Sequence, residues 1–472
     1  MVKTWATLGV DGVDGVEGVD LHVELPGSGV RKGLTDALRE AVRSGRLAPG
    51  TRLPSSRSLA ADLGIARNTV ADAYADLVAE GWLTARQGSG TRVAERTVVR
   101  PAPESAPPRR EQGRPTYDLV PGSPDLASFP RTAWLKAARR ALTAAPHDAL
   151  GYGDPRGRPE LRTALAGYLS RARGVRADPE RIVICSGFSD GVTLLGAVLR
   201  QRGLRSLAVE SYGLDVHWNL LRRSGLRTTP LPFDELGTRT GDLSGVRTVL
   251  LTPAHQFPMG VPLHPDRRAA VVDWARRTGG LILEDDYDGE FRYDRQPVGA
   301  LQGLDPDRVV YLGTASKSLA PALRLGWLVL PPSLADEVIS LKGGGGWSTG
   351  ALDQLTLAEF ITSGAYDRHV RAARLRYRRR RDALVAALAT RAPAVHATGI
   401  AAGLHAVLQL PPGTEQSVVQ AAAWQGLAVH GLSRYRHPDA APDPLDALVV
   451  GYGTPPDHAW SGALDALCRA LP

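Results

Sequence analysis

Five runs of apolar residues between positions 181 and 314 constrain the fold of this chain more than any other feature. They are RIVICSG (181–187), RSLAVES (205–211), VRTVLLTP (246–253), GGLILEDD (279–286) and RVVYLGT (308–314). Runs of this length and composition are typical of strands buried on both faces. Helical patterns, such as those at 159–172 and 264–277, alternate with them. The alternation predicts a mainly parallel sheet covered by helices, in a large α/β domain.

The C-terminal third of the chain has a different pattern. After about residue 333 it becomes helical and arginine-rich, with DRHVRAARLRYRRRRDAL at 367–384, and then contains shorter strand candidates. Apolar residues recur at helical spacing within the arginine run, which indicates a solvated helix face rather than a nucleic-acid helix. We therefore expect one domain over 117–472, with a large lobe at about 135–333 and a smaller α+β lobe at about 334–472.

Residues 28–94 predict a second, smaller domain. A helical pattern from about residue 30 ends at the turn GRLAPG (45–50). Two further helices follow, joined at Gly64, with Ser55 or Ser56 as the N-cap of the first. The segment LTARQGSGTRV (83–93) has the pattern of a β-hairpin. This order predicts a winged helix-turn-helix domain, mainly α with a small β wing.

A helix-turn-helix presents the first turn of its second helix to base edges, while basic and hydroxyl side chains hold the phosphates. Residues 28–94 contain ten basic and six acidic residues. We therefore expect a double-stranded DNA operator as partner. The expected DNA-binding residues are Arg52, Ser56, Arg57, Arg67, Asn68, Thr69, Gly88, Ser89 and Gly90.

Two segments around this domain have compositions typical of unfolded chain. Residues 1–27 include the repeat GVDGVDGVEGVD (9–20), which predicts a flexible arm. Residues 95–116 are rich in proline and arginine, which predicts an extended linker. The two domains are therefore expected to be tethered rather than fused.

Composition excludes several classes of protein. Two cysteines, Cys185 and Cys468, cannot form a disulfide framework, and no Cys/His cluster has metal-ligand spacing, so we expect no metal site. A signal peptide and a run of about 18 apolar residues are both missing, which predicts a cytoplasmic protein without membrane contact. The net charge of +8 permits a polyanionic partner but does not identify one.

A single lysine lies between two serines in GTASKSLAPALRLGW (313–327). A partly desolvated lysine amine loses its proton readily and forms a Schiff base with a carbonyl group. Hydroxyl and guanidinium groups bind phosphate, and a pyridine ring needs a carboxylate at its nitrogen. The sequence offers these groups in Lys317 for the Schiff base, Thr314, Ser316 and Arg324 for phosphate, and Asp285 and Tyr287 at the end of a buried strand for the ring. Together they predict a pyridoxal 5'-phosphate (PLP) site.

Residues 45–93, from GRLAPG to GSGTRV, resemble the winged-helix domain of GntR-type transcription regulators. The family usually has a serine just before the Arg-Asn-Thr of the recognition helix, where the side chain caps the helix. This chain has Ala66 there. Loss of an N-cap costs about 1 kcal/mol, so we expect a recognition helix that frays more readily and still binds DNA.

Residues 117–472 resemble a fold-type I aminotransferase domain, and its junction with a GntR-type head is the arrangement of the MocR subfamily of regulators. The motifs are YDLVPGSPDLASFPRTAW (117–134), GYGDPRGRPELR (151–162) and TPAHQFPMG (252–260). The resemblance implies a homodimer through the aminotransferase-like domain. It also implies cofactor contacts from Gly187, Phe188 and Ser189 at a helix N-terminus, from His255 and Gln256 beside the ring, and from Tyr152 to the cofactor phosphate of the partner subunit.

Other positions bear on the effector. Arg434 matches a position that binds an effector carboxylate in some members of the subfamily. The segment VESYGLDVHW (209–218) departs from the family pattern, which leaves Tyr212 as the aromatic that would stack on the ring, and Met259 replaces the usual threonine. The effector therefore stays open between PLP itself and an amine or amino acid.

The expected protein is multidomain, with a winged helix-turn-helix and an α/β fold-type I domain that has a smaller α+β lobe. We expect a PLP-dependent DNA-binding transcription regulator rather than an enzyme, with an aldimine on Lys317 as sensor and genes of vitamin B6 or amino-acid metabolism as targets. The alternative is an active aminotransferase with an accessory DNA-binding head. It needs an arginine for the substrate carboxylate, and LVVGYGTPP (448–456) lacks one, so Arg434 would have to serve.

Overall fold

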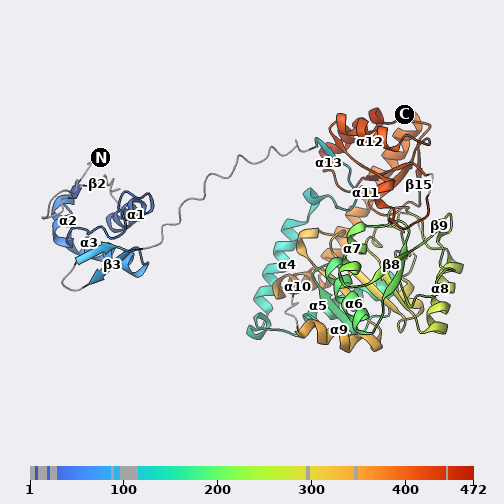
Figure 1. Ribbon diagram of the computed structural model, residues 1–472, viewed down its shortest axis with the longest axis horizontal. Coiled ribbons are helices and arrows are strands. Elements are labelled where there is room, and N and C mark those ends of the chain that lie inside the picture. Colours follow the sequence, from blue (N-terminus) through green and yellow to red (C-terminus); the bar gives the residue numbers. More distant parts are fainter. Residues whose placement is uncertain are drawn as a thin grey trace. The chain divides into compact units, whose positions relative to one another are not determined.

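The computed structural model contains two compact units, residues 1–113 and 114–472, which are described separately here (Figure 1). The structure describes residues 6–8, 19–21, 29–86, 90–95, 115–293, 298–344, 349–442 and 445–472. Across these residues, no helix is long and apolar enough to cross a membrane.

The first unit is a three-helix domain with a hairpin. Its elements are α1 (Val30–Arg43), α2 (Ser56–Leu63), α3 (Arg67–Ala79), β3 (Leu83–Arg86) and β4 (Gly90–Val93). The two strands pair antiparallel, with Leu83 opposite Val93. Leucines on the inner faces of all three helices form one core with these two residues. The predicted winged helix-turn-helix is confirmed.

The ends of the helices follow the sequence closely. The Ser55 hydroxyl accepts a hydrogen bond from the Ser58 amide at 3.1 Å and caps α2, which ends at Gly64 with φ +64°. Helix α3 follows Ala66, whose side chain provides no cap, as predicted. Strands β1 (Ala6–Leu8) and β2 (Val19–Leu21) pair antiparallel within the predicted arm.

A seven-stranded sheet forms the centre of the second unit, in the order β6-β14-β13-β12-β11-β7-β8. Its strands are β6 (Ile182–Cys185), β7 (Ser206–Glu210), β8 (Arg227–Leu231), β11 (Thr248–Leu251), β12 (Leu281–Asp285), β13 (Val309–Thr314) and β14 (Gly326–Val329). Only β14 runs antiparallel to its neighbours among these strands. The predicted mainly parallel sheet is confirmed, and the five apolar runs are five of its strands.

Helices cover both faces of this sheet, as Figure 1 shows. One face packs on α6 (Phe188–Gln201), α7 (Asp215–Arg223) and α9 (Pro332–Gly344). The other packs on α5 (Pro159–Arg173), α8 (Pro265–Thr278) and α10 (Ala351–Thr362), with α4 (Arg131–Ala144) against α10. The short hairpin β9 (Phe233–Asp234) and β10 (Gly237–Thr238) lies outside the sheet. Burial on both faces explains why the strands are continuously apolar.

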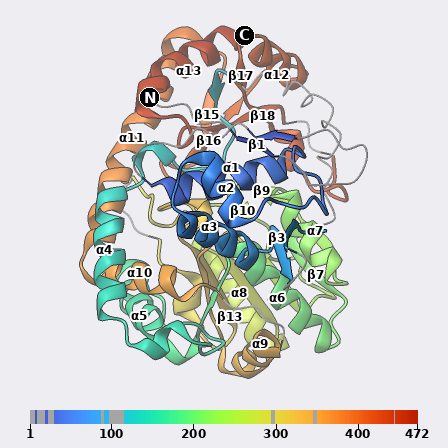
Figure 2. The same ribbon diagram turned by 90° about the vertical axis from the view of Figure 1, so that its left-hand side faces the viewer.

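A smaller lobe contains the antiparallel sheet β15 (His396–Thr398), β16 (His405–Gln409), β19 (Ala447–Gly451) and β18 (His430–Gly431). It packs on α11 (Ala365–Arg391), α12 (Glu415–Trp424) and α13 (Asp457–Ala470). Figure 2 shows α11 running along one side of the unit, from α10 towards α13. At the start of the domain, β5 (Tyr117–Asp118) pairs with β17 (Leu427–Ala428) and joins this lobe.

The boundary between the lobes differs from the predicted position near residue 334. Helices α9 and α10 pack on the large sheet, and the core of the small lobe begins within α11, at Ala373. The arginine run of α11 is mostly exposed, as expected for a solvated face. Arg380 is the exception: its buried guanidinium lies 3.0 Å from Asp125 and 2.6 Å from Asp457. Tertiary packing, not helix pattern, sets this boundary.

Candidate functional site

A cavity of about 500 Å³ opens at the carboxyl ends of the parallel strands in the second unit. This is the edge where ligands bind in open α/β sheets. The structure brings nine of the predicted cofactor residues together in its wall: Phe188, Ser189, Tyr212, Asp285, Tyr287, Thr314, Ser316, Lys317 and Arg324. They come from the ends of β12 and β13, the start of α6 and the loops that follow β7 and β13.

Lys317 projects its amine into this cavity. Its Nζ donates a hydrogen bond to the Gly122 carbonyl. Burial lowers the pKa of the Lys317 amine, and the nearby Asp285 and Asp288 carboxylates partly oppose this effect. A lysine whose pKa is lowered by desolvation reaches its neutral, nucleophilic form more readily.

Asp285 is the last residue of β12 and is buried. Its Oδ1 atom accepts no hydrogen bond from any group that the structure describes. Burial, together with the charge of Asp286, raises the pKa of Asp285 well above its usual range. A buried carboxyl without a partner is costly, and a ring nitrogen that shares its proton would satisfy it. The orphaned oxygen therefore fits a pyridine ring.

The β6–α6 turn and Arg324 form a cradle for an anion. Gly187 has φ +90°, and a Cβ atom there would lie 3.2 Å from Nη1 of Arg324. The Arg324 guanidinium donates to the Ser186 carbonyl and thereby lies across the turn. Ser189 is in the first turn of α6, where free amides and the helix dipole favour negative charge. The Thr314 and Ser316 hydroxyls lie 2.9 Å apart on the same wall. These groups fit a phosphate.

Five other predicted residues do not line this cavity. One of them, Gly187, lies in the turn beside Arg324. His255 and Gln256 are buried behind its wall, and Gln256 Nε2 donates to the Tyr212 carbonyl at 3.0 Å. Arg434 is exposed on the short 3-10 helix Leu432–Tyr435. Tyr152 is fully exposed. The cavity of a single chain is thus built without these four side chains.

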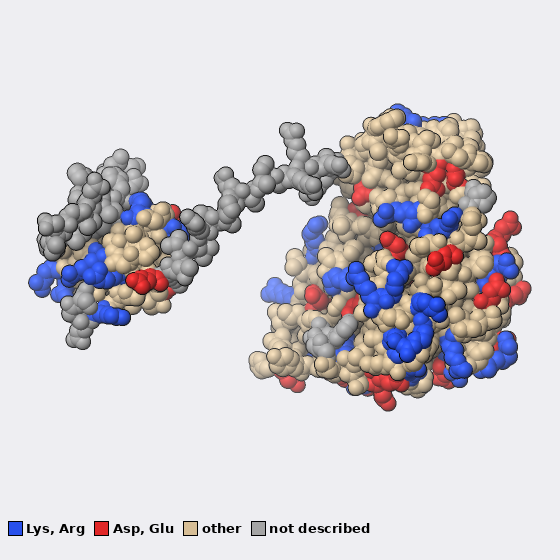
Figure 3. Space-filling model, in the orientation of Figure 1, with Lys and Arg blue, Asp and Glu red and all other residues tan. Residues whose placement is uncertain are grey.

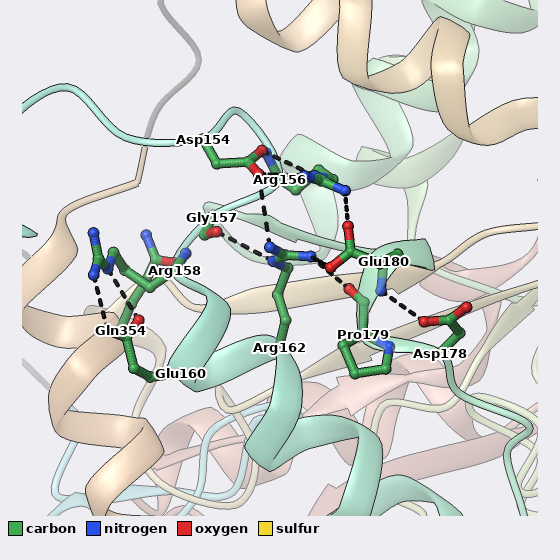
Figure 4. A network of polar contacts seen from close by, with 10 residues as sticks. All are labelled: Asp154, Arg156, Gly157, Arg158, Glu160, Arg162, Asp178, Pro179, Glu180 and Gln354. Carbon is green, nitrogen blue, oxygen red and sulfur yellow. Dashed lines mark hydrogen bonds and ion pairs between the residues drawn. The ribbon is translucent and has the colours of Figure 1, made fainter.

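A polar network holds the loop that carries Tyr152 (Figure 4). The buried Arg162 guanidinium donates to the Gly157 and Pro179 carbonyls, at 3.3 and 2.8 Å. The neighbouring ion pairs and hydrogen bonds involve Asp154, Arg156, Arg158, Glu160, Asp178, Glu180 and Gln354. The Arg156 carbonyl also accepts from the Ile184 amide of β6 at 2.8 Å. The loop is therefore fixed to the sheet edge while Tyr152 projects into solvent.

Several cavity residues were not anticipated from the sequence. They are Asp118, Gly122, Ser123, Glu210, His217, Trp218, Phe257 and His405, among others. The His217 ring lies 4.4 Å from the Phe188 ring, and burial lowers the pKa of His217 to about 3. His405 comes from the small lobe. Seven of these eight residues lie in the segments 117–134, 209–218 and 252–260, whose resemblance to the family could have indicated them, whereas only tertiary packing brings His405 to this wall.

In the first unit, ion pairs neutralise some of the arginines, and other arginines keep their positive charge at the surface. Arg31 pairs with Asp76 at 2.6 Å, and Arg39 pairs with Glu80 at 2.8 Å, which neutralises the second half of α3. By contrast, Arg52, Arg57 and Arg67 are exposed and have no ion pair with any described residue. Figure 3 shows Lys and Arg side chains on the surface of this unit. The unpaired arginines offer contacts to phosphate.

The other predicted DNA-binding residues lie around these arginines. Asn68 and Thr69 are in the first turn of α3, and Ser56 begins α2. Gly90 begins β4, and a Cβ atom there would lie 3.2 Å from Nε of Arg52, so Arg52 lies against the wing. The predicted Gly88 and Ser89 lie outside the described residues.

The comparisons with known proteins agree with this two-part architecture. Residues 31–93 match the family of bacterial regulatory proteins, gntR family, and residues 119–436 match aminotransferase class I and II. The chain is 35% identical to the HTH-type pyridoxine biosynthesis transcriptional regulator PdxR of Corynebacterium glutamicum, covering 89% of this chain and 91% of that relative. It is 33% identical to the probable rhizopine catabolism regulatory protein MocR of Rhizobium meliloti, covering 92% and 91%.

Among solved structures, the chain is similar to an archaeal alanine:glyoxylate aminotransferase. The TM-score is 0.68 and the identity 25%, over 75% of this chain and 90% of that one. This aminotransferase class binds PLP, and the orphaned Asp285 oxygen, the Lys317 amine and the Arg324 cradle fit that cofactor. The chain therefore belongs to the MocR-type transcription regulators, in which a gntR-family DNA-binding domain is joined to a PLP-binding domain of the aminotransferase class.

Proposed function

We propose that this regulator binds PLP at Lys317 and that PLP occupancy changes its affinity for its operator. The observation that carries the proposal is the cavity in which a lysine of lowered pKa faces a buried carboxyl without a partner. When bound, PLP supplies an aldehyde that bonds covalently to a lysine amine and a pyridine ring that withdraws electrons. The residues of this chain hold and orient it.

Each part of the cofactor has a counterpart in the wall. Arg324, the Gly187 turn and Ser189 would bind the phosphate, with the Thr314 and Ser316 hydroxyls beside them. Asp285 would share a proton with the ring nitrogen, and Tyr287 lies in the same wall. Partial burial lowers the pKa of the Lys317 amine, which favours its neutral, reactive form.

The charges of the cavity favour PLP itself as the signal over an amino acid. Lys317 and Arg324 are the only Lys or Arg side chains among the described residues that line it. PLP would use both, so that neither remains for an effector carboxylate, and Arg434 is exposed elsewhere. The lack of a further Lys or Arg among the described lining residues also argues against an aminotransferase that acts on amino acids. The similarity to a regulator of pyridoxine biosynthesis supports vitamin B6 genes as targets.

We also propose that the protein is a homodimer through the second unit. Leu135 and Leu142 of α4, together with Leu150 and Tyr152, are large apolar residues with more than half of their surface exposed. Exposed apolar residues close together in one segment mark interaction sites in soluble proteins. A partner chain would cover them, and the fixed loop would carry Tyr152 to the partner's cavity.

The experiment measures operator binding with and without PLP. Genomic fragments captured by the purified protein would supply an operator, and fluorescence anisotropy would compare the PLP-free protein, the PLP-loaded protein and Lys317→Ala. We expect PLP to change the Kd of the wild type and to have no effect on Lys317→Ala. Lys136→Ala, which removes an exposed lysine of α4, should respond like the wild type. An equal response of Lys317→Ala would contradict the proposal.

A further inference from the structure

The first residues of the second unit, 117–125, are called the entry segment here, and their contacts place them with the small lobe. Strand β5 at their start pairs with β17 of that lobe. The Leu119 carbonyl accepts a hydrogen bond from the Gly451 amide at 2.7 Å, and the Leu119 side chain belongs to the core of the small lobe. The Thr454 hydroxyl donates to the Val120 carbonyl at 2.8 Å.

Asp125 fixes the other end of the entry segment to the same lobe. Its amide donates to the Tyr377 hydroxyl at 3.0 Å, and its carboxylate lies 3.0 Å from the Arg380 guanidinium. Both partners lie in the part of α11 whose apolar residues pack in the core of the small lobe. The small lobe therefore holds the entry segment at both ends.

One hydrogen bond joins the middle of the entry segment to the large lobe. Lys317, in the loop that follows β13, donates from Nζ to the Gly122 carbonyl. Gly122 has φ +111°, a conformation that glycine adopts without strain. Across the described residues, no other hydrogen bond or ion pair runs between the entry segment and residues 130–372, which contain the large sheet and its helices. Lys317 is thus the polar tie between this segment and the large lobe.

A covalent bond between PLP and Lys317 removes this tie for a chemical reason. When a neutral amine reacts with an aldehyde, its nitrogen forms a double bond to the aldehyde carbon, and both of its hydrogens leave with the aldehyde oxygen as water. The nitrogen then carries at most one proton, which the neighbouring phenolic oxygen of PLP accepts. No hydrogen remains on the nitrogen for the Gly122 carbonyl.

We propose that the hydrogen bond from Lys317 to Gly122 is a latch between the two lobes, closed in the PLP-free protein and opened when PLP bonds to the lysine nitrogen. The inference rests on the proposed function, because it requires PLP to bond to Lys317. It adds the contact through which PLP would act on the rest of the chain.

The position of the entry segment connects the latch to DNA binding. The linker predicted at 95–116 leads directly into this segment, so the DNA-binding domain is tethered to the part of the second unit that the latch holds. Opening the latch leaves the small lobe, and the attachment point with it, free to move relative to the large lobe. In the proposed homodimer, such a movement changes how readily both DNA-binding domains reach one operator.

The strength of one hydrogen bond limits the effect of the latch. A ligand shifts an equilibrium between two states only by the difference in its interactions with them. Loss of a hydrogen bond that involves a charged group changes the ratio of closed to open forms by about tenfold to a hundredfold. The operator Kd should therefore change by no more than about a hundredfold through each latch.

The test separates loss of the hydrogen bond from binding of PLP. In Lys317→Ala the latch cannot form, so this variant without PLP should have the operator Kd of the PLP-loaded wild type. In Lys317→Arg a guanidinium N–H can still donate to the Gly122 carbonyl, so this variant should keep the Kd of the PLP-free wild type. Lys136→Ala, at an exposed position of α4, should also keep the PLP-free value. Fluorescence anisotropy on the operator fragment measures these values in full-length protein, and absorbance verifies that no PLP is bound.

Hydrogen–deuterium exchange in the same PLP-free proteins reports on the latch itself. The amides of the entry segment should exchange faster in Lys317→Ala than in the wild type, because the segment opens more often without its tie. In Lys317→Arg and Lys136→Ala they should exchange at the rate of the wild type. Exchange and Kd must also agree within each variant, since both follow from one contact.

The outcomes distinguish the inference from the proposed function. If PLP changes the Kd of the wild type but Lys317→Ala keeps the PLP-free Kd, the inference is overturned and the proposed function stands. Unchanged exchange in Lys317→Ala, or a Lys317→Arg protein in which exchange and Kd disagree, would overturn the inference as well. A wild type whose Kd does not respond to PLP would overturn the proposed function and the inference with it.

Discussion

Replacing Glu290 with glutamine should change how the stability of the second unit depends on pH. Glu290 is 9% exposed, and its Oε1 accepts from Tyr366 at 3.2 Å and from Tyr168 at 3.5 Å. The Tyr366 hydroxyl also lies 2.8 Å from Ser318, the residue after Lys317. Burial, with the charge of Asp286, raises the pKa of Glu290 to about 7. This carboxyl joins α11 to the lysine loop.

The size and sign of the effect follow from the pKa. A change from 4.5 in the unfolded chain to about 7 in the folded one corresponds to about 3 kcal/mol. Because folding raises this pKa, the contribution of Glu290 is fully present below pH 4.5 and is lost as the pH rises through about 7. Glutamine stays neutral and can accept the same tyrosine hydrogen bonds.

Urea unfolding of the full chain, followed by tryptophan fluorescence, measures the free energy of unfolding of the variant and the wild type. At about pH 4 the two should be nearly equal, and at about pH 8 Glu290→Gln should be more stable by up to about 3 kcal/mol. Glu235→Gln, at an exposed position, should show no such difference. A stability difference between Glu290→Gln and the wild type that is the same at both pH values would refute the reasoning.

Three further predictions follow from single contacts. Gly187→Ala should weaken PLP binding about tenfold in an absorbance titration. A φ of +90° strains alanine by about 1–3 kcal/mol, and the Cβ atom would crowd Arg324. Unchanged affinity would argue against this cradle. Arg67→Ala should weaken DNA binding and reduce the salt dependence of log Kd by about one unit, whereas an unchanged slope would exclude a phosphate contact. Arg380→Met should lower the free energy of unfolding by about 3–5 kcal/mol, because Asp125 would remain buried without its cation. Urea unfolding would measure this loss of stability, and a loss under about 1 kcal/mol would contradict the prediction.

The sequence predicted the central sheet and the lysine side of the cavity well, for a physical reason. Strands buried on both faces must be apolar throughout, and residues that follow them at their carboxyl ends meet at one edge. The local sequence around Lys317 and Asp285 was therefore enough to predict that these two residues lie at the same edge of the sheet. The Thr314 and Ser316 hydroxyls beside Lys317 indicated that the site binds a phosphate.

Residues brought in by distant packing were missed. His405 comes from the small lobe and lies in none of the quoted motifs, whereas His217 of α7 lies in the segment 209–218, from which only Tyr212 was predicted. The helical patterns of α9 and α10 predicted helices but not their partners, so the lobe boundary was placed too early. In the arginine run of α11, the helical spacing of the apolar residues indicated a solvated face, and only the fold distinguishes buried Arg380 from its neighbours.

The most direct test of the account is the visible absorption spectrum of the purified protein with added PLP, compared with Lys317→Ala and Lys136→Ala. The account predicts a band of lysine-bound PLP in the wild type and in Lys136→Ala, and none in Lys317→Ala. A band that persists in Lys317→Ala, or its absence from the wild type, would contradict the assignment of Lys317 as the residue that holds PLP.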